Sequence, residues 1–196
     1  MTSGVGQTSR WRTQRIGMVV PEEIVAQYRA LPFGTDALGD CAENDAKVKL
    51  LAELDDHANT EVVAQLLFDV LSATHEFDIA RIEAAKIVGI YINDQCPLER
   101  QLKNQLWHIV CNTDDDTVVR AHASQNIEIG FGGADEQQQV ERLLFDDDDD
   151  IDVRHGALSY LKSTPDVSFA HNLVPRLRAH SYWQKFDGTL GEIASR

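Results

Sequence analysis

Apolar residues along most of this chain recur every three or four positions, which is the spacing of an amphipathic helix. Around Arg154, for example, Val153, Ala157 and Leu161 fall on one stripe of a helix with about 3.6 residues per turn. The chain contains no run of alternating β-branched residues between turn signals, which would indicate a strand. The pattern therefore predicts helices only. Their expected ranges are 22–31, 43–56, 60–73, 78–93, 97–112, 116–129, 136–146, 150–163, 167–179 and 182–194.

The helical pattern repeats along the chain with a period of about 34 residues. Segment 114–127 (DDDTVVRAHASQNI) aligns without a gap with segment 148–161 (DDDIDVRHGALSYL). A third copy is centred on Arg81, and weaker copies are centred on Lys47 and Asp187. The terminal copies diverge most, as expected for end repeats that have only one neighbour. The repeat predicts helical hairpins, each made of a helix, a short turn and a second helix.

The repeated string D-x-x-x-x-V-R-x-x-A occurs at 114–123 and at 148–157. It resembles the signature of HEAT and HEAT-like repeats. The resemblance covers residues 60–163 well and residues 21–196 more weakly. It implies an all-α fold, a right-handed α-solenoid of about five HEAT-like helical hairpins with degenerate terminal repeats. Residues 21–196 would then form a single domain.

In HEAT-like proteins, the aspartate and the arginine of this motif typically form a buried ladder between neighbouring repeats. The resemblance therefore implies a structural role for each arginine and for the aspartate six positions before it. It assigns the ladder to Asp114, Arg120, Asp148, Arg154 and Arg81. The Arg81 copy departs from the pattern, because His75 stands at its aspartate position. Aspartates at a helix start can also accept hydrogen bonds from the unpaired N–H groups of the first turn.

The chain is strongly acidic, with a formal net charge of -14 from 32 acidic and 18 basic residues. Such a surface repels nucleic-acid phosphates and anionic lipids, and no apolar run approaches the ~20 residues needed to span a bilayer. We therefore expect neither nucleic acid nor a membrane as a partner, but a protein with a basic surface; the alternative is that the charge serves solubility alone. The three cysteines include no Cys-x-x-Cys pair, which favours a reducing cytoplasm. Residues 1–20 carry three arginines and no acid, so we expect a flexible basic tail there.

Two acidic turns, 114–116 and 146–150, occupy equivalent places in successive repeats. Stacked helices lie about 10 Å apart, so these turns would form one acidic surface. The positions one, five and eight residues after each arginine would form a concave surface beside it. This hypothesis assigns partner binding to Asp115, Asp116, Asp146, Asp147, Asp149, Lys86, Gln125, Glu128, His155, Ser159 and Lys162. The expected function is non-catalytic binding of a basic protein, as an adaptor or as an inhibitor such as an immunity protein.

Chemistry at a metal or cofactor is disfavoured. The acidic run 146–150 lacks the glycine of a calcium-binding loop. Deoxyhypusine hydroxylases, which are HEAT-like enzymes, hold iron through repeated His-Glu pairs, whereas only His75-Glu76 has that form here. We therefore assign no catalytic residue, metal or cofactor. The alternative is a HEAT-like enzyme or cofactor-attachment factor similar to phycobilin lyases, with a concave pocket lined by His122, His155 and Tyr160.

Overall fold

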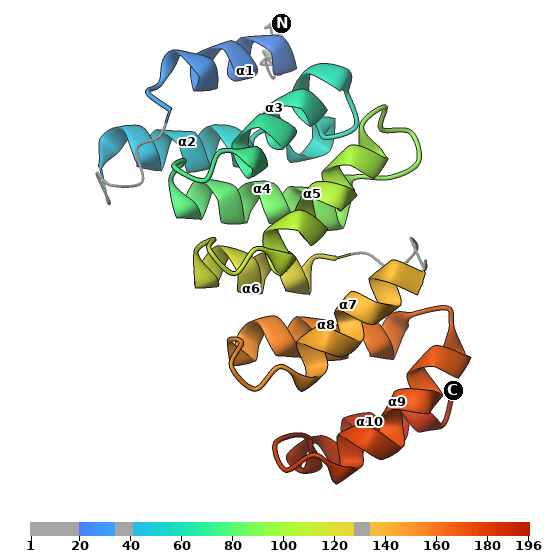
Figure 1. Ribbon diagram of the computed structural model, residues 1–196. Helices are drawn as coiled ribbons and strands as arrows, with labels where there is room; N and C mark the ends of the chain where they lie inside the picture. Colours follow the sequence, from blue (N-terminus) through green and yellow to red (C-terminus); the bar gives the residue numbers. More distant parts are fainter. Residues whose placement is uncertain (1–19, 34–40, 128–133) are drawn as a thin grey trace, which may run out of the picture.

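The computed structural model describes residues 20–33, 41–127 and 134–196, and within these ranges it contains helices and no strand (Figure 1). The all-α prediction is therefore confirmed. The α-helices are α1 (Pro21–Ala30), α2 (Ala42–Ala52), α3 (Glu61–Ser72), α4 (Asp78–Tyr91), α5 (Glu99–Cys111), α6 (Thr117–Gln125), α7 (Ala134–Phe145), α8 (Ile151–Ser163), α9 (Val167–Ala179) and α10 (Asp187–Ala194). None of them is long and apolar enough to cross a membrane. The expected basic tail lies outside the described residues, apart from Val20.

The predicted helix ranges agree with the observed ones to within a few residues, except near two helix ends. The last helix was expected from residue 182, but a 3-10 turn, η3 (Trp183–Phe186), comes first and α10 begins at Asp187. Helix α6 ends at Gln125, and the last two positions of its expected range lie outside the described residues. A second 3-10 turn, η2 (Asp55–His57), follows α2.

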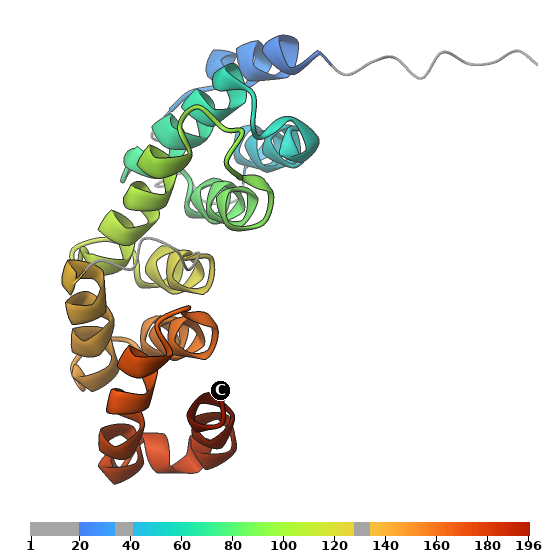
Figure 2. The same ribbon diagram turned by 90° about the vertical axis from the view of Figure 1, so that its right-hand side faces the viewer.

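The helices lie in two layers that the chain visits alternately. Figure 2 shows the even-numbered helices nearly end-on in one layer and the odd-numbered helices in the other. Each even-numbered helix packs against the next one, from α2 to α10, while α1 packs on α3 and α3 on α5. Successive helical hairpins therefore follow one another from the N-terminal to the C-terminal end of the molecule (Figure 1).

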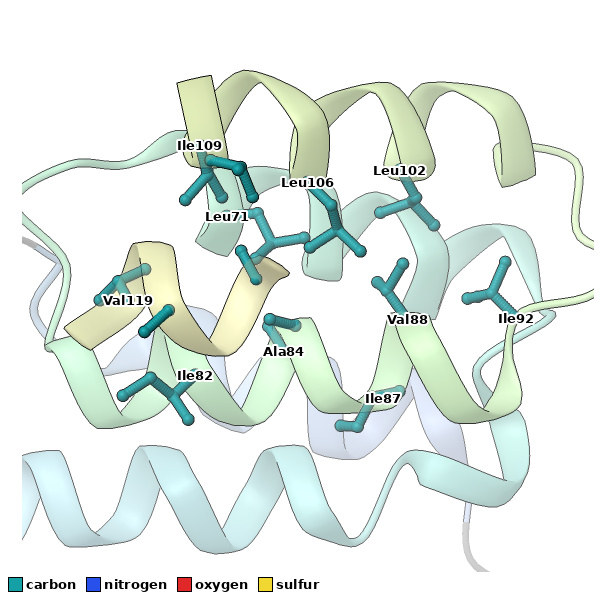
Figure 3. Close-up of a cluster of buried hydrophobic side chains, with 14 of the residues drawn as sticks. Leu71, Ile82, Ala84, Ile87, Val88, Ile92, Leu102, Leu106, Ile109 and Val119 are labelled. Carbon is teal, nitrogen blue, oxygen red and sulfur yellow. The ribbon is translucent and has the colours of Figure 1, made fainter. Parts of the chain in front are cut away.

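The core lies between the two layers, where the apolar stripes of facing helices meet. Leu102, Leu106 and Ile109 on α5 point towards α4, where they meet Ala84 and Val88 (Figure 3). All five side chains are at most 1% exposed. Burial of each large aliphatic side chain contributes roughly 1.5–3 kcal/mol, so these stripes hold neighbouring hairpins together.

The even-numbered helices are also buried on their flanks. The side chains of Ile82 and Ile87 project from α4 on the side that faces α2 (Figure 3), and they are only 4% and 1% exposed. Helices α6 and α8 approach each other closely. A Cβ added at Gly156 would lie only 2.1 Å from the Ser124 hydroxyl oxygen. A side chain at position 156 would therefore push the two helices apart.

Aspartates begin several helices, as the sequence predicts. The Asp116 carboxylate accepts hydrogen bonds from the N–H groups of Val118 and Val119, and it thereby caps α6. Asp150 caps α8 through the N–H of Asp152 in the same way. Each cap satisfies N–H groups that the first turn of a helix leaves unpaired, typically contributing about 1 kcal/mol. These caps fix where α6 and α8 begin.

Candidate functional site

Four cationic side chains are buried at equivalent positions on successive even-numbered helices. All are at most 4% exposed, although charged residues are rarely buried to this extent without a partner. They are Lys47 on α2, Arg81 on α4, Arg120 on α6 and Arg154 on α8. The repeat places them in one line along the stack.

The two central arginines each bind a carboxylate in the turn of the following hairpin. Arg81 donates from both terminal nitrogens to Asp115, at 2.6 and 2.7 Å. Arg120 binds Asp149 in the same way, with both distances 2.8 Å, and also donates to the Val110 carbonyl. Such paired contacts fix orientation as well as distance, so each links its hairpin to the next in one register.

A third link joins α2 to the turn before α4. Lys47 donates to Glu76, and both side chains are fully buried. Glu76 lies five residues before Arg81, just as Asp115 lies five before Arg120 and Asp149 five before Arg154. The absence of an aspartate at His75 therefore does not interrupt the ladder, because the paired acid stands one position later.

This spacing of five residues between the paired acid and the following arginine corrects two of the predictions made from the sequence. Asp114 and Asp148 were expected in the ladder, but both are exposed to solvent. Asp115 and Asp149 were expected to bind a partner, but each side chain is only 4% exposed and is held by an arginine. Of the adjacent carboxylates in each turn, one is directed towards the preceding even-numbered helix. It belongs to the residue five positions before the arginine, Asp115 or Asp149.

Hydrogen bonds and nearby positive charges keep Asp115 and Asp149 ionised. Burial is the largest single influence and would raise the pKa of both, but the hydrogen bonds and charges of the arginines, together with a backbone hydrogen bond, outweigh it. The pKa of each carboxyl therefore lies below its usual value. Both acids remain negatively charged at neutral pH, as their arginine partners require.

The line of buried cations ends differently at its C-terminal end. Arg154 donates to Asp147 at 2.8 Å, and the Asp147 side chain is 66% exposed. The centre of its guanidinium lies 5.2 Å from the ring centroid of Tyr182 and 5.4 Å from that of Trp183. The Trp183 indole is fully buried and donates to the Leu144 carbonyl at 2.8 Å. Here aromatic rings occupy the place that an acid has in the preceding hairpins.

The acids outside the ladder gather on two turns at the same end of their hairpins (Figure 1). We call this surface the acidic edge: Asp114, Asp116, Asp146, Asp147 and Asp148. A hollow of about 430 Å³ lies at these turns, lined by Thr113, Thr117, Arg120, Asp146, Asp148, Asp149 and Asp150. Three of the predicted partner-binding acids, Asp116, Asp146 and Asp147, belong to the acidic edge. Asp114 and Asp148 are exposed, and their carboxylates can attract a cationic group without disturbing the ladder, whereas Asp146 is half-buried and Asp147 pairs with Arg154.

The residues predicted to line a concave face differ in their exposure. Gln125 and Ser159, five positions after their arginines, are exposed, and Lys86 is half-buried beside Glu83 at 3.4 Å. One position after Arg81 and Arg120, the side chains of Ile82 and Ala121 are buried. The even-numbered helices pack on both flanks, so the buried arc is wider than one stripe.

The remaining residues predicted on that face have different environments. Lys162 is exposed and pairs with Glu192 on α10 at 2.8 Å. His155 is half-buried, with its Nε2 2.8 Å from the Tyr182 hydroxyl. Glu128 lies outside the described residues.

Two of the exposed aliphatic residues on the even-numbered helices lie at equivalent positions that were not predicted for binding. Ile79 on α4 and Val118 on α6 both lie two positions before a buried arginine, and they are 48% and 55% exposed. The available signal was the helical period, because a residue two positions before the arginine lies away from the apolar stripe. An apolar residue at that position is directed to solvent.

Two of the residues proposed for an alternative ligand pocket, His155 and Tyr160, pack against different aromatic neighbours. Tyr160 is buried with its ring edge-on to Trp107, at a centroid distance of 6.1 Å, whereas His155 packs against Tyr182 and Phe186. Burial raises the pKa of Tyr160 and lowers that of His155, which favours the neutral form of both side chains. Across the described ranges, no group of three His, Cys, Asp or Glu side chains is placed to hold a metal ion.

In comparisons with known proteins, no protein-family model, no curated protein and no solved structure matches this chain. The arrangement of its own side chains is therefore the basis for a functional assignment. Two features of that arrangement are accessible to a partner: the acidic edge and the exposed face of the even-numbered helices.

Proposed function

We propose that this chain is a right-handed, HEAT-like α-solenoid of five hairpins that binds a basic protein partner without catalysing a reaction. Support for the solenoid comes from the two alternating layers and from the ladder, which repeats one contact between successive hairpins. In such an architecture each hairpin covers its apolar side by packing on the next. The outer surface is then continuous and available for binding.

The acidic edge is the observation on which the partner's chemistry depends. Asp114 and Asp148 are exposed at equivalent positions of neighbouring hairpins, one position before the acids that the ladder binds. The ladder therefore neutralises one carboxylate in each turn and leaves the adjacent one in solvent. Two such turns place like charges close together, which costs free energy unless a cation approaches.

A basic protein surface fits this arrangement better than other ligands. Phosphates and anionic lipids would be repelled by the net charge of -14. A lysine- or arginine-rich protein would be steered towards the edge, and the acceleration would weaken as salt is added. An adaptor or an inhibitor of a basic enzyme fits this behaviour. The cysteines Cys41, Cys96 and Cys111 are free, which supports our assignment to the cytoplasm.

The test reverses the charge of the acidic edge without touching the ladder. Wild-type protein and the double variant Asp114→Lys, Asp148→Lys are immobilised and exposed to native lysate at about 50 mM and about 300 mM salt. We expect a basic protein to bind the wild type at low salt and to be lost from the double variant. The matched control, Glu23→Lys with Glu61→Lys, changes the net charge equally on the other layer and should bind like the wild type. Retention of the same proteins by the Asp114, Asp148 variant would contradict the proposal.

A further inference from the structure

The position two residues before each buried cation forms a row across the even-numbered helices. Ile79 occupies this position on α4 and Val118 on α6, two helices that pack directly against each other. Their side chains are about half exposed, at 48% and 55%. Two aliphatic side chains at equivalent points of adjacent helices therefore form a pair directed to solvent.

Acids flank this aliphatic pair on both sides. The same position is occupied by Asp45 on α2 and by Asp152 on α8, and both are exposed. We call the four residues Asp45, Ile79, Val118 and Asp152 the docking row. Along the stack the docking row reads acid, aliphatic, aliphatic, acid. An apolar centre within a charged rim is the anatomy of many protein interfaces.

We infer that the docking row binds a segment of the protein partner that carries two apolar side chains between basic ones. The apolar side chains contact Ile79 and Val118, and the basic ones approach Asp45 and Asp152. An acidic or purely apolar segment would leave these carboxylates unpaired or repelled. The inference rests on the proposed function and specifies the chemistry of the partner.

The geometry of the stack sets the spacing within that segment. Packed helices lie 8–10 Å apart, so the two apolar side chains of the segment must also be separated by about 10 Å. An extended polyproline-like chain places residues i and i+3 on one face about 9 Å apart. An α-helix places residues i and i+7 on one face about 10.5 Å apart. Either spacing fits the row, whereas adjacent apolar residues do not.

The experiment selects binders from a library of random peptides of about 16 residues, displayed on phage, with the purified full chain as the target. Such peptides are long enough to reach across the whole row when extended. We expect the enriched peptides to be basic and to carry two large apolar residues at i and i+3 or at i and i+7. Enrichment of acidic peptides, of peptides without such a pair, or of none overturns the inference.

Affinities of the enriched peptides are then measured by fluorescence anisotropy on two double variants. Ile79→Asp with Val118→Asp adds two acids to the row, so attraction of a basic peptide by charge alone would increase. We expect instead a loss of affinity of at least about tenfold, with the melting temperature unchanged because both side chains are exposed. The control, Gln101→Asp with Gln138→Asp, adds the same charge at exposed positions of the odd-numbered layer and should not weaken binding. Unchanged affinity in the first variant overturns the inference.

The two proposals fail in distinguishable ways. One outcome is a protein partner that requires the acidic edge, as shown with Asp114→Lys and Asp148→Lys, and yet binds the Ile79, Val118 variant as tightly as the wild type. That result would overturn the docking row and leave the proposed function in place. A partner that requires neither surface would overturn both.

Discussion

Helix α8 has a neighbour on each side, and the two interfaces are built differently. Towards α6, the turn before α8 supplies Asp149 to the buried Arg120, and Gly156 lies against Ser124. Towards the last hairpin, the cation of α8 itself lies over aromatic rings, and the buried indole of Trp183 fills the interface. The first interface is defined by a paired charge contact and close backbone approach, whereas the second combines a buried aromatic cluster with the single hydrogen bonds of His155 and Trp183.

The two interfaces divide between them two tasks that most protein cores combine, the alignment of neighbouring elements and the burial of apolar surface. A guanidinium bound through two nitrogens tolerates little change in angle or distance, so the α6–α8 interface determines how the hairpins are aligned. An aromatic cluster buries much apolar surface with weaker directional demands, so it can close the end of a stack where no further turn supplies an acid. The interior interfaces therefore provide register, and the terminal interface provides burial.

The largest expected effect is that of Trp183→Ala. Truncation of a fully buried tryptophan costs about 3–5 kcal/mol. Because contacts run mainly between neighbouring hairpins, hydrogen exchange should accelerate in α9 and α10 more than in α3 to α6. Trp183→Phe keeps most of the apolar area and loses the hydrogen bond to Leu144, so its effect should be clearly smaller. Equal acceleration along the whole chain would contradict a separate terminal interface.

Asp149→Ala should destabilise the interior interface by about 3 kcal/mol or more, because it leaves the buried Arg120 without its carboxylate. The measurement is the free energy of unfolding from urea denaturation. Asp147→Ala, in the same turn, is the matched control. That carboxylate is 66% exposed, and Arg154 keeps its contacts with the Leu144 carbonyl and the aromatic rings, so the loss should cost clearly less than that of Asp149. Similar costs for the two variants would show that burial does not distinguish them.

Gly156→Ala should destabilise the protein by about 1–3 kcal/mol, because the added Cβ collides with Ser124. The thermal unfolding temperature is the convenient measurement. Gly188→Ala provides the control, since a Cβ at Gly188 meets nothing within 4 Å. That substitution should be neutral or slightly stabilising, because alanine is favoured over glycine in a helix. A neutral Gly156→Ala would mean that α6 and α8 do not need their close approach.

Acid should weaken the interior interface by a smaller and gradual amount. The pKa values of Asp115 and Asp149 lie below that of an unfolded aspartate, which is about 3.9. Their contribution to stability is therefore complete above that value and is lost as the pH falls through the folded-state pKa. The urea midpoint should change little on this account between pH 7 and about 5 and should fall below about 4. Asp149→Asn should fall less steeply, and an identical slope would contradict the role of this carboxyl.

The helices and the buried cations could be predicted from the sequence, because both follow from periodicity. A 3.6-residue pattern identifies a helix whatever its neighbours, and a repeated position carries Arg81, Arg120 and Arg154. The ladder acid was predicted one residue too early. Both strong copies contain three consecutive aspartates, so the sequence there does not distinguish the two positions. Only Glu76, in the less regular copy, marks the correct one.

The exposed face was predicted less well than the core. A single helix has one apolar stripe, but Ile82 shows that an even-numbered helix is also covered by the neighbours before and after it. The extent of that coverage depends on how closely neighbouring helices approach each other, as at Gly156 and Ser124. The hydrophobic period of one helix does not predict that distance. Exposed residues such as Ile79 and Val118 become evident only when both flanks are accounted for.

The order of the ladder residues along the chain also has a consequence for synthesis. Three of the four buried cations pair with an acid that comes later in the chain, by 29 residues for Lys47 and Glu76, 34 for Arg81 and Asp115, and 29 for Arg120 and Asp149. During synthesis on the ribosome, a newly emerged hairpin of this kind therefore lacks its ladder carboxylate until the following turn is made. A nascent chain that stalls between hairpins presents its last hairpin without the contact that links it to the next one.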